Sequence, residues 1–112
     1  MLHNIWIYGI YQMKNKNYNT TKEGNAWKKE TIKKVFEKGK TIKGFSNTLW
    51  RHDKCDDPIK FSEFGNRKSI HGWEIDHINP IANKGGDELN NLQPLQWENN
   101  LEKGDNINWK CY

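Results

Sequence analysis

Hydrophobic residues recur at helical spacing in the first half of the chain, among many lysines. Residues 25–39 carry them on one side, with Asn25 as a candidate N-cap and Gly39 at the end. They are Trp27, Ile32, Val35 and Phe36. The pattern predicts a basic amphipathic helix. Residues 40–58 follow no clean period and contain Gly, Asn and Pro, so we expect a loop there.

Strand-like alternation of hydrophobic and polar residues begins after this loop. Residues 59–64 and 70–78 both alternate, and the turn sequence GNRKS lies between them. Two alternating segments joined by a turn are typical of a hairpin, which we expect here. A long polar loop follows Pro80, over residues 81–91.

The pattern near the C-terminus predicts one more strand and a second helix. Residues 92–96 read as a short extended segment, which Pro94 limits to the edge of a sheet because proline has no backbone N–H. Residues 97–105 read as a short helix closed by Gly104.

The length of 112 residues allows one small domain. We expect that domain over residues 25–112, with its core resting heavily on the six tryptophans. Residues 1–24 match no pattern and are expected to form an N-terminal arm, either disordered or adding a strand.

The longest apolar stretch, residues 5–11, is too short to span a membrane and lacks the layout of a signal peptide. We therefore expect a soluble, cytoplasmic protein without a membrane partner. Cys55 and Cys111 each stand alone, so neither a paired-cysteine zinc site nor a disulfide framework is visible. The prediction is two free thiols.

Charge divides the chain into two unlike halves. Residues 1–50 carry ten lysines and three glutamates, a net charge of +7, whereas residues 51–112 carry eight basic and eleven acidic side chains, a net charge of −3. A basic half can hold a polyanion while carboxylates act elsewhere, although a solvated lysine-rich surface has the same composition.

The sequence EIDHINP, residues 74–80, places Asp76 beside His77 near the end of a predicted strand. A carboxylate can bind a hard cation such as Mg²⁺, and an imidazole can take a proton from water near neutral pH. A surface ion pair or a capping interaction would account for the same two residues taken alone.

The surrounding sequence resembles the HNH family of nucleases. The resemblance is carried by GWEIDHINPIANKGGDELNNLQPLQWENNLEKGD, residues 72–105. Within it an Asp-His pair ends a strand, a proline follows, a Gly-Gly loop leads to Asn-Leu, and Asn-x-x-Lys lies on the last helix. The resemblance implies an α+β fold with a ββα-metal (His-Me finger) core, here with an N-terminal basic helix and hairpin.

The resemblance also implies a role for four residues. His77 would be the general base, and Asp76 and Asn100 would bind one divalent cation. Asn91 would orient the imidazole and hold the loop. Because Asn100 stands where many relatives have histidine, oxygen ligands dominate the site, which favours Mg²⁺ or Mn²⁺ over Zn²⁺. The paired cysteines that hold a structural zinc in some relatives are missing, so we expect none.

A weaker resemblance extends upstream to about residue 25, as in small HNH proteins encoded by phages, viruses and bacteria. The candidate DNA contacts are Lys28, Lys29, Lys33, Arg51 and Lys103, with Lys34 and Lys38 beside them. Two of these residues have another interpretation. Lys103 could simply be a lysine at a helix end, where the helix dipole favours positive charge, and Arg51 could form a salt bridge with Asp53.

Other polar and aromatic residues receive simpler interpretations. His52 and His71 are expected at the surface, and Glu74 as a solvated carboxylate beside the site. Five tryptophans are expected in the core rather than as platforms for bases: Trp27, Trp50, Trp73, Trp97 and Trp109.

The sequence thus predicts a metal-dependent endonuclease acting on DNA, with duplex DNA as the expected partner. A homodimer would be the simple way to cut both strands. The alternative is an HNH-fold module that binds nucleic acid without cutting it. A small metal-stabilised structural protein is disfavoured by the basic half.

Overall fold

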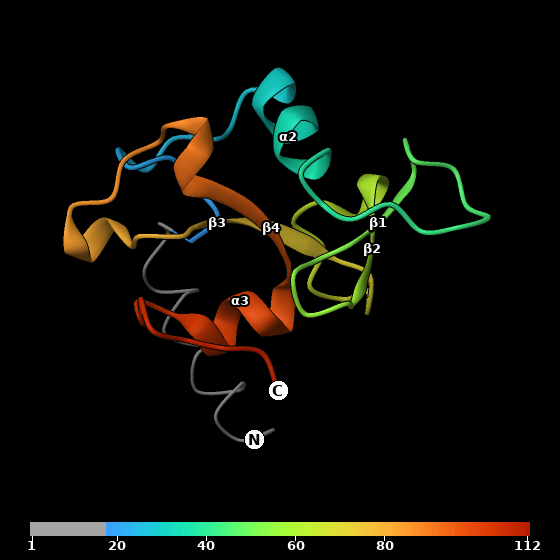
Figure 1. Cartoon of the computed structure of the whole chain (residues 1–112). Helices are drawn as coiled ribbons and strands as arrows, with labels where there is room; N and C mark the ends of the chain where they lie inside the picture. Colours follow the sequence, from blue (N-terminus) through green and yellow to red (C-terminus); the bar gives the residue numbers. More distant parts are fainter. Residues whose placement is uncertain (1–17) are drawn as a thin grey trace.

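The computed structural model describes residues 18–112, so most of the predicted arm, residues 1–17, lies outside the described residues. Within residues 18–112 the fold is α+β, as predicted, and consists of two helices and two small antiparallel hairpins. The elements are α2 (Lys29–Phe36), β1 (Trp50–His52), β2 (Pro58–Lys60), β3 (Trp73–His77), β4 (Leu92–Gln96) and α3 (Trp97–Lys103). Figure 1 shows the β3–β4 pair in the middle of the molecule, with α2 and α3 on opposite sides of it.

The C-terminal half is built as strand, strand and helix in direct succession. β3 and β4 pair antiparallel from Trp73 opposite Gln96 to His77 opposite Leu92, and α3 packs against both strands. The side chain of Gln96 caps α3, because its Oε1 accepts hydrogen bonds from the second and third backbone N–H groups of the helix. The strand predicted at 92–96 is confirmed. The helix is also confirmed, ending at Lys103 with Gly104 (φ 51°) after it.

The core lies between α2 and the β3–β4 pair. Every residue of β3 is buried. Phe36 from α2 packs on Trp73, with ring centroids 5.2 Å apart, and Phe64 contacts the same indole at 4.8 Å. Of the five tryptophans expected in the core, Trp27 and Trp73 are buried. The other three are half-buried.

The predicted hairpin between residues 59–64 and 70–78 is wrong. β2 pairs instead with β1, which lies inside the stretch expected to be a loop, and β3 pairs with β4. Residues Phe61–Glu63 form a 3-10 turn, and Phe64 makes only an isolated bridge to Trp73. The alternation at 59–64 therefore arises because its aromatic side chains pack on the core.

The first helix is shorter than the predicted 25–39. It begins at Lys29 after Lys28, which occupies the N-cap position without a side-chain hydrogen bond, so Asn25 is not the cap. Trp27 precedes the helix and packs against His77, with ring centroids 5.6 Å apart. The hydrophobic spacing at Trp27 thus reflects a contact with the end of β3.

The two cysteines form a disulfide, so the prediction of free thiols is wrong. Cys55 and Cys111 are 56 positions apart in sequence, and their Cα atoms lie 5.3 Å apart. The bond ties the C-terminal segment to the loop between β1 and β2. Such a separation follows no local spacing rule, so the pairing of the two cysteines depends on the folded chain.

No helix within residues 18–112 is long and apolar enough to cross a membrane.

Candidate active site

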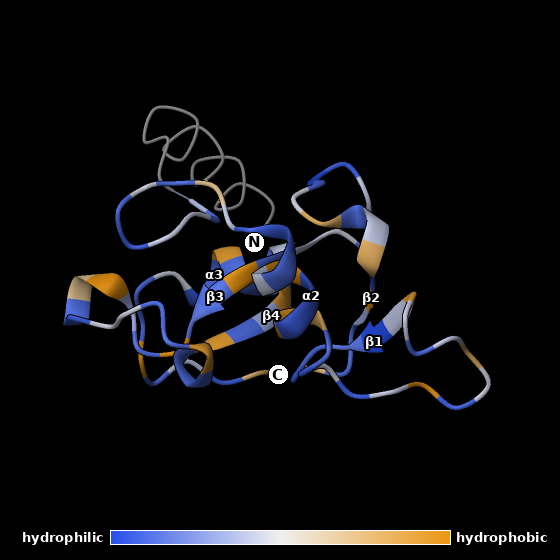
Figure 2. Cartoon of the chain, turned by 90° about the horizontal axis from the view of Figure 1, so that it is seen from above, coloured by the Kyte–Doolittle hydropathy of each residue, from blue (hydrophilic) through white to orange (hydrophobic). Residues whose placement is uncertain are grey.

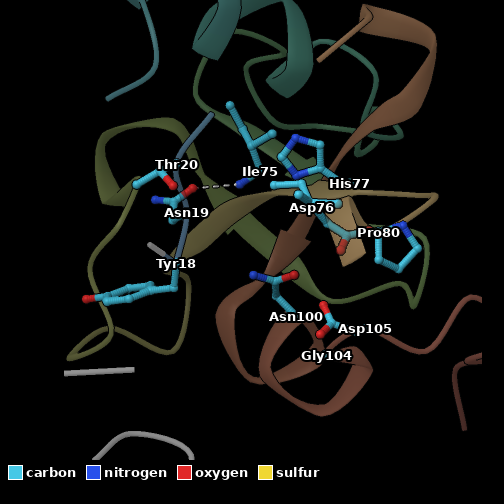
Figure 3. A pocket seen from close by; sticks show the side chains of 11 residues that line it. Tyr18, Asn19, Thr20, Ile75, Asp76, His77, Pro80, Asn100, Gly104 and Asp105 are labelled. Atoms are coloured by element: carbon cyan, nitrogen blue, oxygen red, sulfur yellow. Dashed lines mark hydrogen bonds between the residues drawn. The ribbon is translucent and has the colours of Figure 1, made fainter. Parts of the chain in front are cut away.

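A pocket of about 150 Å³ lies where β3, α3 and the segment at residues 18–20 meet. Asp76 and His77 line it from β3, and Asn100 lines it from α3. Figure 3 shows the Asn100 amide and the Asp105 carboxylate below the strand and the His77 ring above it. Adjacent side chains leave a strand on opposite faces, and the His77 ring accordingly lies across the strand from Asn100, although both residues of the Asp-His pair contribute to the lining of the pocket.

The Asp76 carboxylate is 5% exposed and has two side-chain partners. Its Oδ1 lies 3.1 Å from Lys103 Nζ, and its Oδ2 accepts a hydrogen bond of 2.8 Å from Gln93 Nε2. Burial raises the pKa of the Asp76 carboxyl above its usual value, while the hydrogen bond from Gln93 and the charge of Lys103 oppose that shift. The carboxylate is thus partly desolvated and faces a polar pocket.

Lys103 is 4% exposed and belongs to the site rather than to the surface. Besides the ion pair with Asp76, its Nζ donates a 3.0 Å hydrogen bond to the backbone oxygen of His77. The predicted residue therefore joins α3 to the end of β3, and its charge is directed at the carboxylate.

The Asn100 side chain is oriented by a buried ion pair. Its Nδ2 donates to Glu74 Oε1 at 2.9 Å, and Arg67 donates two hydrogen bonds to the same carboxylate, at 2.8 and 2.9 Å. Because an ionised carboxylate can only accept hydrogen bonds, this contact fixes the orientation of the Asn100 amide. The Oδ1 atom of Asn100 does not take part in the contact with Glu74. Glu74 is fully buried, which corrects the expectation of a solvated carboxylate.

The His77 imidazole is held by an aspartate from the polar loop. Its Nε2 lies 2.8 Å from Asp87 Oδ1, and the Asp87 carboxylate also accepts hydrogen bonds from the backbone N–H of Lys22. With a carboxylate as partner, Nε2 is the nitrogen that carries the proton. Nδ1 is then the nitrogen whose lone pair can accept a proton.

Asn91 holds the loop that carries Asp87. Its Oδ1 accepts from the backbone N–H of Asn79, and its Nδ2 donates to the backbone oxygens of Asn79 and Gly86. A Cβ at Gly85 would lie 1.7 Å from Asn79 O, so the tight loop requires glycine there. The predicted loop-holding role matches this geometry, while the contact with the imidazole comes from Asp87.

Three site residues were missed by the sequence reasoning. Asp87 follows the Gly-Gly loop, and that position was a usable signal because the loop returns toward the Asp-His pair. No sequence signal marks Arg67 or Gln93, because their roles depend on contacts with residues that become neighbours only in the folded chain.

The predicted DNA-binding lysines differ in their surroundings. Lys28, Lys29 and Lys33 are exposed on or beside α2. Lys34 pairs with Glu30 at 3.1 Å across one helical turn. Lys38 is used structurally, because its Nζ donates to the backbone oxygens of Leu89 and Leu92, and burial lowers its pKa.

Arg51 makes backbone contacts rather than the expected salt bridge with Asp53. Its guanidinium donates to the carbonyls of Asn47, Glu37 and Gly39, at 2.9, 2.9 and 3.1 Å. Neither predicted surface histidine is fully exposed: His52 and His71 are both half-buried beside β1 and β2.

The residues of the pocket fit a hard cation with few protein ligands. Within residues 18–112 no group of three or more His, Cys, Asp or Glu side chains is placed to hold a metal ion. Asp76 and Asn100 nevertheless both line one pocket, and their side chains carry carboxylate and amide oxygens. Mg²⁺ is commonly held by one or two protein carboxylates, with water and substrate phosphate completing its shell, so this donor set suits it.

The fold and the pocket define a small α+β domain with an Asp-His site at the end of its central strand. Residues 53–106 match the family model of the HNH endonucleases. The match confirms, over this segment, the resemblance predicted from the sequence. The match contains β3, β4 and α3 and begins at Asp53, so the weaker resemblance upstream of that residue stays a prediction. Searches of the curated proteins and of the solved structures found no match.

The match to this family suggests a nuclease-type function in general. Nucleases of the family act on nucleic acid and generally use a divalent metal ion.

Proposed function

We propose that this protein is a metal-dependent endonuclease that hydrolyses phosphodiester bonds in DNA, with His77 as the general base. The observation that carries the proposal is the His77–Asp87 contact of 2.8 Å beside the pocket lined by Asp76 and Asn100. An oriented imidazole beside two side chains that carry oxygen atoms supports both the proposed base and the proposed metal site.

His77 would remove a proton from the attacking water through Nδ1. Asp87 holds the other nitrogen, so it fixes the tautomer and stabilises the imidazolium that forms when the proton arrives. The Trp27 ring packs against the imidazole and shields it on one side. An imidazole held in this way needs no reorientation before it accepts the proton.

Asp76 and Asn100 would hold the cation, and the preference for oxygen ligands favours Mg²⁺, with Mn²⁺ as the second choice. When bound, such an ion neutralises charge that develops on the phosphate and on the leaving 3′ oxygen. Lys103 shares the Asp76 carboxylate at 3.1 Å. Its positive charge favours the ionised form of this buried acid, which is the form that binds a metal.

DNA would be held mainly through its phosphates by the exposed lysines Lys28, Lys29 and Lys33, with Arg51 as a further predicted contact. These contacts give affinity without reading sequence, and that affinity should fall as salt rises. We take duplex DNA as the substrate, and a homodimer as the form that would cut both strands.

Nicking of supercoiled plasmid tests the proposal. Purified protein is incubated with Mg²⁺, Mn²⁺ or EDTA, beside His77→Gln and the control Asn90→Gln, which changes an exposed residue outside the pocket. We expect nicked or linear plasmid only with metal, a loss of about 10³-fold in rate for His77→Gln, and little change for Asn90→Gln. Circular dichroism of each variant checks that it is folded.

The opposite result is also informative. If the wild type binds plasmid but does not cut it with either metal, and His77→Gln binds equally well, the chain is a nucleic-acid-binding module. Cleavage that persists in His77→Gln would remove His77 from the role of base while keeping the nuclease assignment.

A further inference from the structure

A second pocket lies away from the Asp-His site, against β1 and β2. Its volume is about 340 Å³, and it is almost wholly apolar. We call it the Trp50 pocket, and it is lined by Ile42, Phe45, Trp50, His52, Pro58 and His71. Figure 2 shows the hydrophobic positions in the long loop that precedes β1, at the edge of the molecule.

Three aromatic rings stand at steep angles around this pocket. The Trp50 and His71 rings are 4.9 Å apart at 83°, and the Phe45 and Trp50 rings are 6.3 Å apart at 66°. His71 is fixed in place by a 3.1 Å contact between its Nδ1 and the backbone oxygen of Pro58. Phe45 is 58% exposed, so a large aromatic surface remains open to a ligand.

The rings of the Trp50 pocket are not part of the hydrophobic core. The core cluster is formed by other residues, around Trp73 and Phe36. An exposed aromatic group that the core does not require is a common mark of a binding site. The size of the pocket is at the lower end for small-molecule sites, which suits one planar heterocycle.

The charge around the pocket decides between possible ligands. Aromatic rings can surround a quaternary ammonium, but here the Lys60 ammonium already lies 5.6 Å from the centre of the Trp50 ring. Two histidines also line the pocket, and Lys43 is exposed on the same loop. These groups disfavour a cation and favour a neutral ring attached to an anion, which is the chemistry of a nucleotide.

The pocket lies within reach of a DNA strand held at the Asp-His site. His71 lines the pocket and His77 lies in the active site, six positions later in the chain. Six residues of extended chain span at most about 20 Å, which bounds the distance between their Cα atoms. At about 3.4 Å per nucleotide, this corresponds to roughly six nucleotides.

We propose that the Trp50 pocket receives a nucleobase that has left the base stack, so that this nuclease prefers DNA with an unpaired nucleotide near the cleaved bond. The inference rests on the proposed nuclease function and adds a substrate class to it. Phe45 and Trp50 would stack on the base, and Lys60 would contact the adjoining phosphate.

Binding is tested on the full chain in EDTA, so that cleavage plays no part. The probes are a short DNA duplex with one extrahelical thymine, the same duplex with an abasic residue in its place, and the fully paired duplex. Fluorescence anisotropy should show the thymine probe bound about tenfold more tightly than the other two. Phe45→Ala should remove this difference, Phe45→Tyr should keep it, and the control Leu49→Ala, an exposed residue of the same loop outside the pocket, should also keep it.

Cleavage supplies a second measurement. With Mg²⁺ and the thymine probe, cuts should cluster within about six nucleotides of the unpaired base, and Phe45→Ala should spread them along the duplex. Equal affinity for the thymine and abasic probes overturns the inference, as does a uniform loss of affinity in Phe45→Ala. If sedimentation then shows that Phe45→Ala converts a dimer to a monomer, the pocket is occupied by a second copy of the chain.

The two proposals can fail separately. Plasmid cleavage without any preference for an unpaired base overturns only the pocket. Preference for the thymine probe without metal-dependent cleavage overturns only the nuclease assignment.

Discussion

Two aspartates of this domain are buried but differ in what surrounds their carboxylates. Asp53 lies in the loop after β1, and Asp76 lies in β3. Asp53 is 1% exposed, and its oxygens accept four hydrogen bonds. Asp76 is nearly as buried, but its partners are two long, flexible side chains and it faces a pocket. Burial alone therefore does not separate a structural acid from a functional one.

The partners of Asp53 explain its structural role. Three of its four donors are backbone N–H groups, from Cys55, Asp57 and Gln96, at 2.9 to 3.0 Å. The fourth is the side chain of Asn99 in α3. The carboxylate thus joins the β1–β2 loop, where the disulfide to Cys111 begins, to the junction of β4 and α3. It has no capacity left for a ligand.

The partners of Asp76 allow change. The Lys103 ammonium and the Gln93 amide can both move or turn when another group approaches the carboxylate. The two aspartates thus differ in their hydrogen-bond donors. Backbone N–H groups supply most of the donors to Asp53, whereas only side chains donate to Asp76.

The largest expected effect comes from Asp76→Asn. We expect plasmid cleavage with Mg²⁺ to fall by about 10³-fold or more, because the substitution removes the charged metal ligand. Stability should also fall, because the neutral amide leaves the buried Lys103 ammonium without its counter-ion. Urea unfolding gives the stability, cleavage is therefore compared per folded molecule, and Glu88→Gln, an exposed acid of the polar loop after Pro80, is the control. Cleavage that stays near the wild-type value per folded molecule would place Asp76 in the same structural class as Asp53.

Asp53→Asn should lower stability without lowering cleavage. The new amide N–H₂ would face N–H donors that cannot turn, so we expect a loss of about 2–3 kcal/mol in the free energy of unfolding. Cleavage per folded molecule should stay near the wild-type value. Asp56→Asn is the matched control, because it lies in the same loop, is exposed, and keeps a residue type that tolerates its positive φ of 62°. Equal destabilisation by both changes would contradict the account of Asp53.

The sequence predicted those parts of the fold and the site that depend on local pattern. The β4 strand and α3 follow from hydrophobic spacing, Pro94 and Gly104, and the Asp-His pair stands out because a motif surrounds it. The β1–β2 hairpin was missed because each strand has only three residues, too few to show a period. The Arg67–Glu74 pair and the disulfide join segments whose proximity is created only by folding.

Asp87, which contacts the proposed general base, gives the smallest expected effect. Its carboxylate is neither filled by backbone donors as that of Asp53 is, nor a proposed metal ligand like that of Asp76. We expect Asp87→Asn to lower kcat by 10- to 100-fold, about the size found for residues that orient a site through another residue, with KM for DNA unchanged. Asp87→Glu should recover part of that loss, because it restores a carboxylate to His77 Nε2.

A double variant separates positioning from general damage to the fold. If Asp87 acts through His77, adding Asp87→Asn to His77→Gln should cause no further loss of kcat, because the imidazole it orients is already gone. Additive losses, or a rise in KM that accompanies the fall in kcat, would mean that Asp87 supports the loop or the DNA contact instead. In that case its second contact, the backbone N–H of Lys22, would be the more important one, and the carboxylate would belong with Asp53 among the structural acids.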